Sequence, residues 1–390
     1  MSTTLHDSIG LGWRRADGRI GLRNHVIAVS TVALTDRVTV LAAAQVSGIL
    51  PITPAFQRGL RGVDAILQKD MIKAIIAHPN VGAALIVTHD RASAVELQAV
   101  CAELEKPIFV ISLMAQRGMQ VAQKVLATHL RILLDATAGH SKSEFKLSDL
   151  TVALECGGSD ATSALCANPA IGRFVDRLIE AGGTAIVSET AEFLGGEDVV
   201  RTQSQTPEIA DAILTHLSVE EAMMNSDGTD YRGVNPTQEN IEAGLSTLTE
   251  KTMGALCKIG TSRFAGALNF GEPPRGEGLY FMNTPFFSPT SLTGMVLGGA
   301  QVSLFAIGVF NPSSMPLAPT IKICGNPMTL SDWSDAIDLD VAGIISGQPS
   351  YDDAADEILA TVKLISEGQI TCAEKLQEGQ IILPITQSPL

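Results

Sequence analysis

The sequence predicts an α/β protein with two domains, each built on a mostly parallel sheet that is flanked by helices. Its 390 residues exceed what one ordinary hydrophobic core accommodates. Hydrophobic residues make up 45% of the chain and aromatic residues only 4%, so aliphatic side chains must fill most of the cores. Short apolar runs alternate with amphipathic segments of helical length, which is typical of βαβ units and of a parallel sheet.

The first domain is expected to cover residues 1–140. Strands are predicted over residues 25–30, 84–88 and 107–112, and helices over 35–45, 60–77, 92–104 and 116–130. The polar stretch 136–148 has no periodicity and marks the boundary between the domains.

The second domain is expected to cover residues 146–390. Its predicted strands are residues 151–155, 184–189, 278–283, 301–308 and 320–325. Helices are predicted at 171–181 and 291–297, through most of 197–257, and in one final amphipathic segment at 351–376.

Charge and hydropathy exclude several kinds of partner. The formal net charge of -15 argues against nucleic acid, because phosphate binding needs clustered Lys and Arg. No apolar run reaches the roughly 18 residues that a membrane span requires. Residues 1–10 show neither the basic nor the apolar region of a signal peptide, so a cytoplasmic location is expected. The six cysteines are scattered and are interpreted as free thiols.

Familiar nucleotide and hydrolase motifs are also absent from the sequence. There is no G-x-G-x-x-G after the first strand and no G-x-x-x-x-G-K-[ST], so dinucleotide and P-loop sites are unsupported. There is likewise no G-x-S-x-G and no H-E-x-x-H.

Polar residues gather where the predicted strands of the second domain end. Ligands of open parallel sheets bind beyond the carboxyl ends of the strands. Directly after the strand 151–155 come Cys156, Gly157, Gly158, Ser159 and Asp160. Two glycines would let consecutive backbone N–H groups point at an anion, and the serine adds a hydroxyl. The alternative is a tight turn with a buried thiol, and Cys156 itself is either a ligand or reactive group or an inert small hydrophobe.

Three carboxylates follow the strand 184–189. Glu189, Glu192 and Glu197 could hold a hard divalent metal or act as general bases. Acidic residues are also enriched at helix N-termini, where the macrodipole favours them. Glu197, which precedes Asp198, fits that alternative better than Glu189 and Glu192 do.

Positive or imidazole groups for a substrate or metal are few. Arg232, Lys251 and Lys258 are the candidates for binding a carboxylate, although each taken alone is more typical of a solvated surface. His25 precedes the first strand and His89 follows the second, and either is more often structural than a ligand.

Read together, these segments resemble the family of altronate dehydratase, galactarate dehydratase and the large subunit of (R)-sulfolactate sulfo-lyase. The similarity covers nearly the whole chain. It is carried by residues 13–25, by CGGSDATS (156–163) with Asn168-Pro169, by SETAEFLGGE (188–197), by Asn235-Pro236, by GLSTLTEK (244–251), and by residues 292–302 and 318–326.

The resemblance implies a lyase that eliminates a β-leaving group from a small anionic sugar acid or 2-hydroxy acid. It also implies a divalent metal, first Fe²⁺, with Mn²⁺ or Mg²⁺ as alternatives. Glu189, Glu192 and Lys251 are then the expected catalytic residues. The expected substrate- or anion-binding residues are Gly157, Gly158, Ser159, Asp160, Ser163, Arg232 and Asn235, and the expected metal ligands are Cys156, Glu197 and His25.

The alternatives differ in leaving group and in role. Dehydration of a sugar acid comes first, and carbon–sulfur cleavage of 3-sulfolactate is the second enzymatic hypothesis. Residues 52–59 lack the cysteine of the family's N-x-x-G-C-G-Q element, which leaves room for a non-catalytic binding or regulatory subunit. A covalent role for Cys156 is a further alternative. Single-chain members begin with a small β-rich domain that is missing here, so a separate small β-rich subunit is expected, together with a homo-oligomer.

Overall fold

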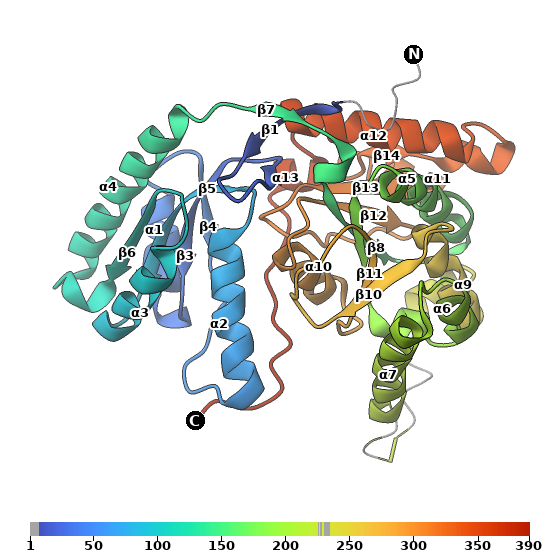
Figure 1. Ribbon diagram of the computed structural model, residues 1–390, viewed down its shortest axis with the longest axis horizontal. Coiled ribbons are helices and arrows are strands. Elements are labelled where there is room, and N and C mark those ends of the chain that lie inside the picture. Colours follow the sequence, from blue (N-terminus) through green and yellow to red (C-terminus); the bar gives the residue numbers. More distant parts are fainter. Residues whose placement is uncertain (1–7, 225, 227, 230–234) are drawn as a thin grey trace. The chain divides into compact units, whose positions relative to one another are not determined.

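The computed structural model describes residues 8–224, 226, 228–229 and 235–390. The chain divides into two compact units (Figure 1). The small unit comprises residues 11–143 together with 380–390, and the large unit comprises residues 144–379 together with the segment that ends at Gly10. Both units contain a parallel sheet with helices packed on it, which confirms the predicted α/β class.

The small unit is built on a four-stranded sheet. Its strand order is β4 (Ile49–Ile52), β3 (His25–Ser30), β5 (Val81–Thr88) and β6 (Ile108–Ser112), and every neighbouring pair is parallel. Its helices are α1 (Asp36–Ala43), α2 (Gly62–Ala77), α3 (Arg91–Cys101) and α4 (Met119–Ala138). The sequence did not predict β4, because this short edge strand contains Pro51 and is only partly buried, so it lacks a strand pattern.

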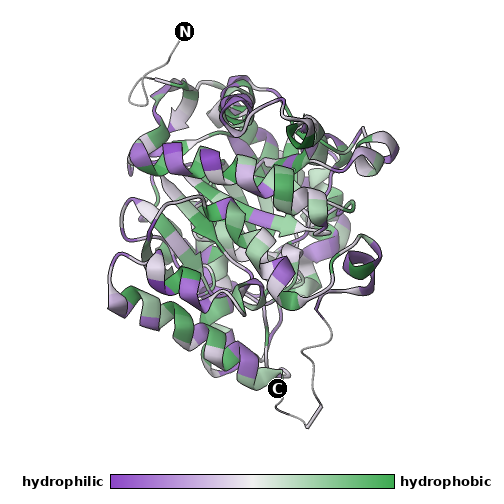
Figure 2. Cartoon of the chain, turned by 90° about the vertical axis from the view of Figure 1, so that its right-hand side faces the viewer, coloured by the Kyte–Doolittle hydropathy of each residue, from purple (hydrophilic) through white to green (hydrophobic). Residues whose placement is uncertain are grey.

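The large unit is built on a seven-stranded parallel sheet. Its order is β10 (Phe264–Leu268), β11 (Gly278–Met282), β9 (Thr184–Val187), β8 (Thr151–Gly157), β12 (Val302–Ile307), β13 (Thr320–Cys324) and β14 (Leu339–Asp340). Strands β11, β12 and β13 are buried along their whole length, and apolar residues dominate the strands inside this unit (Figure 2). This continuous burial is expected of a sheet that is covered on both faces.

The helices of the large unit are α5 (Asn168–Glu180), α6 (Glu197–Thr202), α7 (Pro207–Met223), α8 (Gln238–Glu242), α9 (Leu248–Leu256), α10 (Ser288–Leu297), α11 (Pro327–Asp332), α12 (Tyr351–Glu367) and α13 (Cys372–Leu376). The final segment 351–376 was predicted as one helix and is two. Gly368 has φ 124°, which ends α12, and the Thr371 side chain caps α13 by accepting a hydrogen bond from the Glu374 N–H.

The order of the strands places a ligand crevice beside β8. The chain passes from β8 to β9 on one side and later returns from β11 to β12 on the other side of β8. Such a reversal opens a crevice at the carboxyl ends of the central strands.

A further three-stranded sheet has the order β2 (Ile20–Gly21), β1 (Gly10–Arg14) and β7 (Ser143–Phe145). No helix in the described part of the chain is long and apolar enough to cross a membrane.

Candidate active site

A cavity of about 370 Å³ lies at this crevice, at the carboxyl ends of β8, β9 and β12. Residues from six separate stretches line it. Its polar lining includes Cys156, Gly157, Gly158, Ser159, Glu189, Glu192, Asn240 and Lys251, and its apolar lining includes Phe286, Phe287, Val309 and Phe310. The cavity therefore brings the CGGSD segment and the first two carboxylates of SETAE together.

The two glycines after β8 allow close approach of the loop that follows β12. Gly158 has φ 62°, and a Cβ there would lie 1.9 Å from the carbonyl oxygen of Val309. A Cβ at Gly157 would lie 2.5 Å from Asn311 Nδ2. Larger residues at these positions would push the two loops apart.

Gly158→Ala is expected to lower the free energy of unfolding by ~3 kcal/mol, because it combines a left-handed backbone with an overlap that the Val309 backbone cannot relieve. Gly244→Ala is the matched control, since Gly244 also has a positive φ of 101° but has nothing within 4 Å of its Cβ position. Urea unfolding of both variants tests this expectation, and equal losses would contradict it.

Ser159, Asp160 and Ser163 have different surroundings. The Ser159 hydroxyl is buried at the cavity and has no hydrogen-bond partner among the described residues. Asp160 instead accepts hydrogen bonds from the Ser163 N–H (2.7 Å) and from Asn326 Nδ2 (2.7 Å). The Ser163 hydroxyl donates to the Asp160 carbonyl at 2.8 Å. Asp160 and Ser163 thus hold the turn, as Asp does when it caps a helical segment, and neither lines the cavity.

A buried ionic cluster surrounds Glu192, which lies in the 3₁₀ turn η5 (Thr190–Phe193). Lys258 Nζ is 2.8 Å from Glu192 Oε2 and 3.1 Å from Cys156 Sγ. The Cys156 thiol also donates to Glu192 Oε2 at 3.0 Å. Both members of the ion pair are 1% exposed, so water hardly screens their attraction. Lys258 therefore does not lie on the surface, where the sequence suggested it would.

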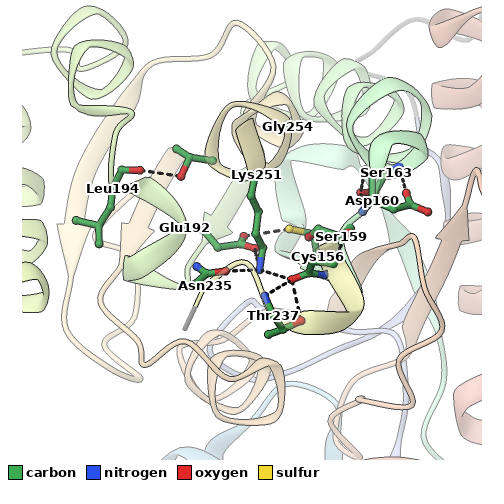
Figure 3. A network of polar contacts seen from close by, with 12 residues as sticks. Cys156, Ser159, Asp160, Ser163, Glu192, Leu194, Asn235, Thr237, Lys251 and Gly254 are labelled. Atoms are coloured by element: carbon green, nitrogen blue, oxygen red, sulfur yellow. Dashed lines mark hydrogen bonds and ion pairs between the residues drawn. The ribbon is translucent and has the colours of Figure 1, made fainter. Parts of the chain in front are cut away.

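Lys251 approaches the same carboxylate from α9 (Figure 3). Its Nζ lies 4.0 Å from Glu192 Oε1 and donates to Asn235 Oδ1 at 3.0 Å and to Asn240 Oδ1 at 3.3 Å. The ammonium also lies 4.3 Å from the centre of the Phe286 ring. Lys251 is buried, and it is a lysine that both lines the cavity and has a carboxylate within ionic reach.

Glu189 begins η5 in a strained conformation. Its φ of 65° and ψ of 81° are left-handed, which is rare for a residue with a side chain. Its backbone N–H donates to Thr284 Oγ1 at 2.9 Å, which helps to hold this geometry. Strain of this kind concentrates at functional sites, and the Glu189 side chain lines the cavity.

The carboxyl groups of the cavity are in opposite electrostatic environments. Burial together with the charges of Glu155 and Glu192 raises the pKa of Glu189 well above its usual value. Burial alone would also raise the pKa of Glu192, but Lys258 and Lys251 outweigh it and lower that pKa. Burial raises the pKa of the Cys156 thiol well above its usual value, so this group is a neutral thiol. One carboxyl group thus holds a proton where its neighbour is ionised.

Besides Asp160 and Ser163, the predicted residues Glu197, His25 and Asn235 are not part of the cavity lining. Glu197 lies at the first turn of α6, where its Oε1 accepts a hydrogen bond from the Gly195 N–H at 3.0 Å, so the helix-terminus interpretation applies to it. His25 is the first residue of β3 in the small unit. Arg232 lies outside the described residues. Asn235 is buried and bonds to Lys251, as described above.

Comparisons with known proteins agree with this architecture. A family model described as D-galactarate/altronate dehydratase, C-terminal, matches residues 147–388. A second, described as D-galactarate dehydratase/altronate hydrolase, second domain, matches residues 12–137. The chain belongs to this family. Its members named by the comparisons are lyases, and the chain is an enzyme of that class.

Three relatives show how far this dehydratase family extends along the chain. The β subunit of (2R)-sulfolactate sulfo-lyase from Chromohalobacter salexigens is 29% identical over 96% of this chain and 96% of its own length. Altronate dehydratase from Escherichia coli is 26% identical over 93% of this chain and 75% of its own. Galactarate dehydratase from the same bacterium is 28% identical over 57% of this chain and 42% of its own.

Sequence reasoning did not name Glu155 as a candidate site residue, and it named Lys258 only as a candidate more typical of a solvated surface. Glu155, the last residue of the predicted strand TVALE, was interpreted only as part of the strand. Its carboxylate is buried and accepts a hydrogen bond from the Ser291 hydroxyl at 2.5 Å. Lys258 follows an exposed cysteine, so no local pattern showed that it is buried. A charged residue at the inner end of a buried strand was the signal available for Glu155.

Glu155 should make the stability of this family member depend on pH. Burial raises the pKa of Glu155 from 4.5 to about 8. The folded state then keeps a proton that the unfolded chain releases, so this contribution is complete below pH 4.5 and is lost as the pH rises through about 8. Between pH 6 and pH 9, the free energy of unfolding should therefore fall less in Glu155→Gln than in the wild type, as measured by urea unfolding. Exposed Glu357→Gln is the control, and an equal loss in both variants would contradict the expectation.

The residues of this cavity do not fit a divalent metal as they stand. In the described part of the chain, no group of three or more His, Cys, Asp or Glu residues could hold a metal ion. The oxygen Glu192 Oε2 and the sulfur of Cys156 are already occupied by the Lys258 ammonium group.

Proposed function

We propose that the cavity of the large unit catalyses β-elimination from a small anionic 2-hydroxy acid, with dehydration of a sugar acid as the first candidate reaction. The observation that supports this most is the pairing of Glu192 and Glu189, whose pKa values are shifted in opposite directions within one cavity. Two carboxyl groups driven apart in this way make one a base and the other an acid.

Each step of the elimination has a candidate group. Glu192, the ionised carboxylate, removes the proton from the carbon next to the substrate carboxylate. Glu189, the protonated carboxyl group, gives its proton to the hydroxide that leaves the neighbouring carbon. The enol product then tautomerises to a 2-keto acid.

The substrate carboxylate would bind to Lys251 and to the Ser159 hydroxyl. Lys251 supplies the positive charge, and the Ser159 hydroxyl has no described protein partner, so it can donate to the substrate without losing another bond. The negative charge that develops on the substrate carboxylate falls on the same two donors. Phe286, Phe287 and Phe310 line the cavity and limit the water around the reacting carbons.

Carbon–sulfur cleavage of 3-sulfolactate is the second candidate. The β subunit of the sulfo-lyase matches this chain over 96% of both lengths, whereas altronate dehydratase extends beyond the matched region. Sulfite leaves as an anion without needing a proton, so Glu189 would not have to give up its proton in that reaction. The word "subunit" in that relative's name supports a separate small subunit for this chain as well.

The experiment that tests these proposals measures two products. The purified chain, alone and with a candidate small β-rich subunit, is incubated with a panel of sugar acids and with 3-sulfolactate. Formation of 2-keto acid from a sugar acid without sulfite supports dehydration, and release of sulfite together with pyruvate supports the second candidate. Binding of these acids without either product would refute the catalytic proposal. The cytoplasmic location and the homo-oligomer stay predictions.

A further inference from the structure

We propose that the ammonium group of Lys258 occupies the position beside Cys156, one of the expected metal ligands, and Glu192 that a divalent metal ion would need in order to bind there. This inference concerns the same cavity as the proposed function, but its test does not require turnover. The divalent metal expected from the sequence would then not bind at this cluster.

The contacts of Lys258 occupy the donor atoms that a metal would need. Its Nζ lies 2.8 Å from Glu192 Oε2 and 3.1 Å from Cys156 Sγ, which are hydrogen-bond distances. A metal ion would have to approach the same oxygen and sulfur to about 2.0–2.3 Å. The ammonium and the metal cannot both be there, because their positions would overlap.

The backbone that carries Lys258 is held in place. Lys258 lies in the 3₁₀ turn η7 (Cys257–Ile259), which packs against α5. A Cβ at Gly172 of α5 would lie 2.1 Å from the carbonyl oxygen of Cys257, so η7 and α5 approach as closely as a glycine allows. Gly260, directly after η7, has φ 63° and is in similarly close contact with the backbone of Gly172. The backbone of Lys258 is therefore held in place against α5.

The charges of the cluster also disfavour a further cation. Lys258 and Lys251 both lie near Glu192, at 2.8 and 4.0 Å. Two ammonium groups thus already lie beside this one carboxylate, and they would repel a divalent ion that approached it.

The test counts metal in three forms of the chain. Wild-type protein, Cys156→Ala and Cys324→Ala are produced in iron- and manganese-supplemented medium and purified without oxygen. Cys324 is the control because it is also a buried free thiol at the end of a strand, β13, but contacts no lysine in the described structure. We expect Cys156→Ala to contain as much metal as the wild type. About one metal ion per chain in the wild type and in Cys324→Ala, lost in Cys156→Ala, would overturn the proposal.

A second measurement uses the wild-type chain, so it does not depend on the folding of a variant. Co²⁺ is added to metal-free protein, and the charge-transfer absorption of a thiolate bound to cobalt is monitored. We expect no such band from Cys156, because its sulfur contacts the Lys258 ammonium instead. Iodoacetamide labelling of Cys156 is located by peptide mass spectrometry. A cobalt–thiolate band that disappears on this labelling would overturn the proposal. Neither the metal content nor the cobalt absorption depends on lyase activity. A failure of the proposed function can therefore be told apart from a failure of this proposal.

Discussion

Glu192→Gln is expected to lower kcat by ~10²–10⁴-fold, because the substitution removes the ionised carboxylate that takes the α-proton while keeping the size of the side chain. Lys258 and Lys251 hold this carboxylate ionised inside the protein, and an amide at the same place cannot accept a proton from carbon. The measurement is the rate of 2-keto acid formation at saturating substrate, with circular dichroism to show that the variant is folded.

Hydrogen exchange separates the roles of the two carboxyl groups. In D₂O, the wild type and Glu189→Gln should both exchange the α-hydrogen of the substrate, because Glu192 is intact in both. Glu192→Gln should not exchange it. Exposed Glu242→Gln, from α8, is the control for a generic loss of one carboxylate. Exchange that survives in Glu192→Gln would assign the base to another residue.

Lys258→Met is expected to lower the free energy of unfolding by ~3–5 kcal/mol, because it leaves the Glu192 carboxylate buried without its closest positive partner. Methionine nearly preserves the volume of the lysine stem, so loss of charge and not loss of packing dominates the effect. Urea unfolding at neutral pH measures the change.

A double variant shows whether the ion pair causes this loss. Lys258→Met with Glu192→Gln removes both charges, and it should be more stable than the sum of the two single losses predicts, by ~0.5–3 kcal/mol. Lys322→Met is the matched control, since Lys322 is also fully buried and pairs with Glu378, far along the sequence from Glu192. Strict additivity of Lys258→Met and Glu192→Gln would show that the contact between them does not matter for stability.

Periodicity predicted most of the fold but not the edges of the sheets. The strands at residues 25–30 and 151–155 were evident because their interiors are buried and apolar. β4 and β10 were missed, since each is short and contains Pro51 or Gly266, residues that are typical of turns. The prediction of a single final helix was wrong. The apolar periodicity continues past Gly368, but the backbone leaves the helical conformation there, at φ 124°.

The sequence by itself determined that polar residues end the central strands of the second domain, and it identified Cys156, Ser159, Glu189 and Glu192 as neighbours in one site. Parallel strands force this result, because their carboxyl ends meet at one edge of the sheet. Only the tertiary structure decided that Asp160 turns toward Asn326, that Glu197 lies in the first turn of a helix and bonds to Gly195, and that Lys258 lies buried beside Glu192. The charge state of a side chain depends on what surrounds it in space, and residues 156, 192 and 258 come together only when the chain folds.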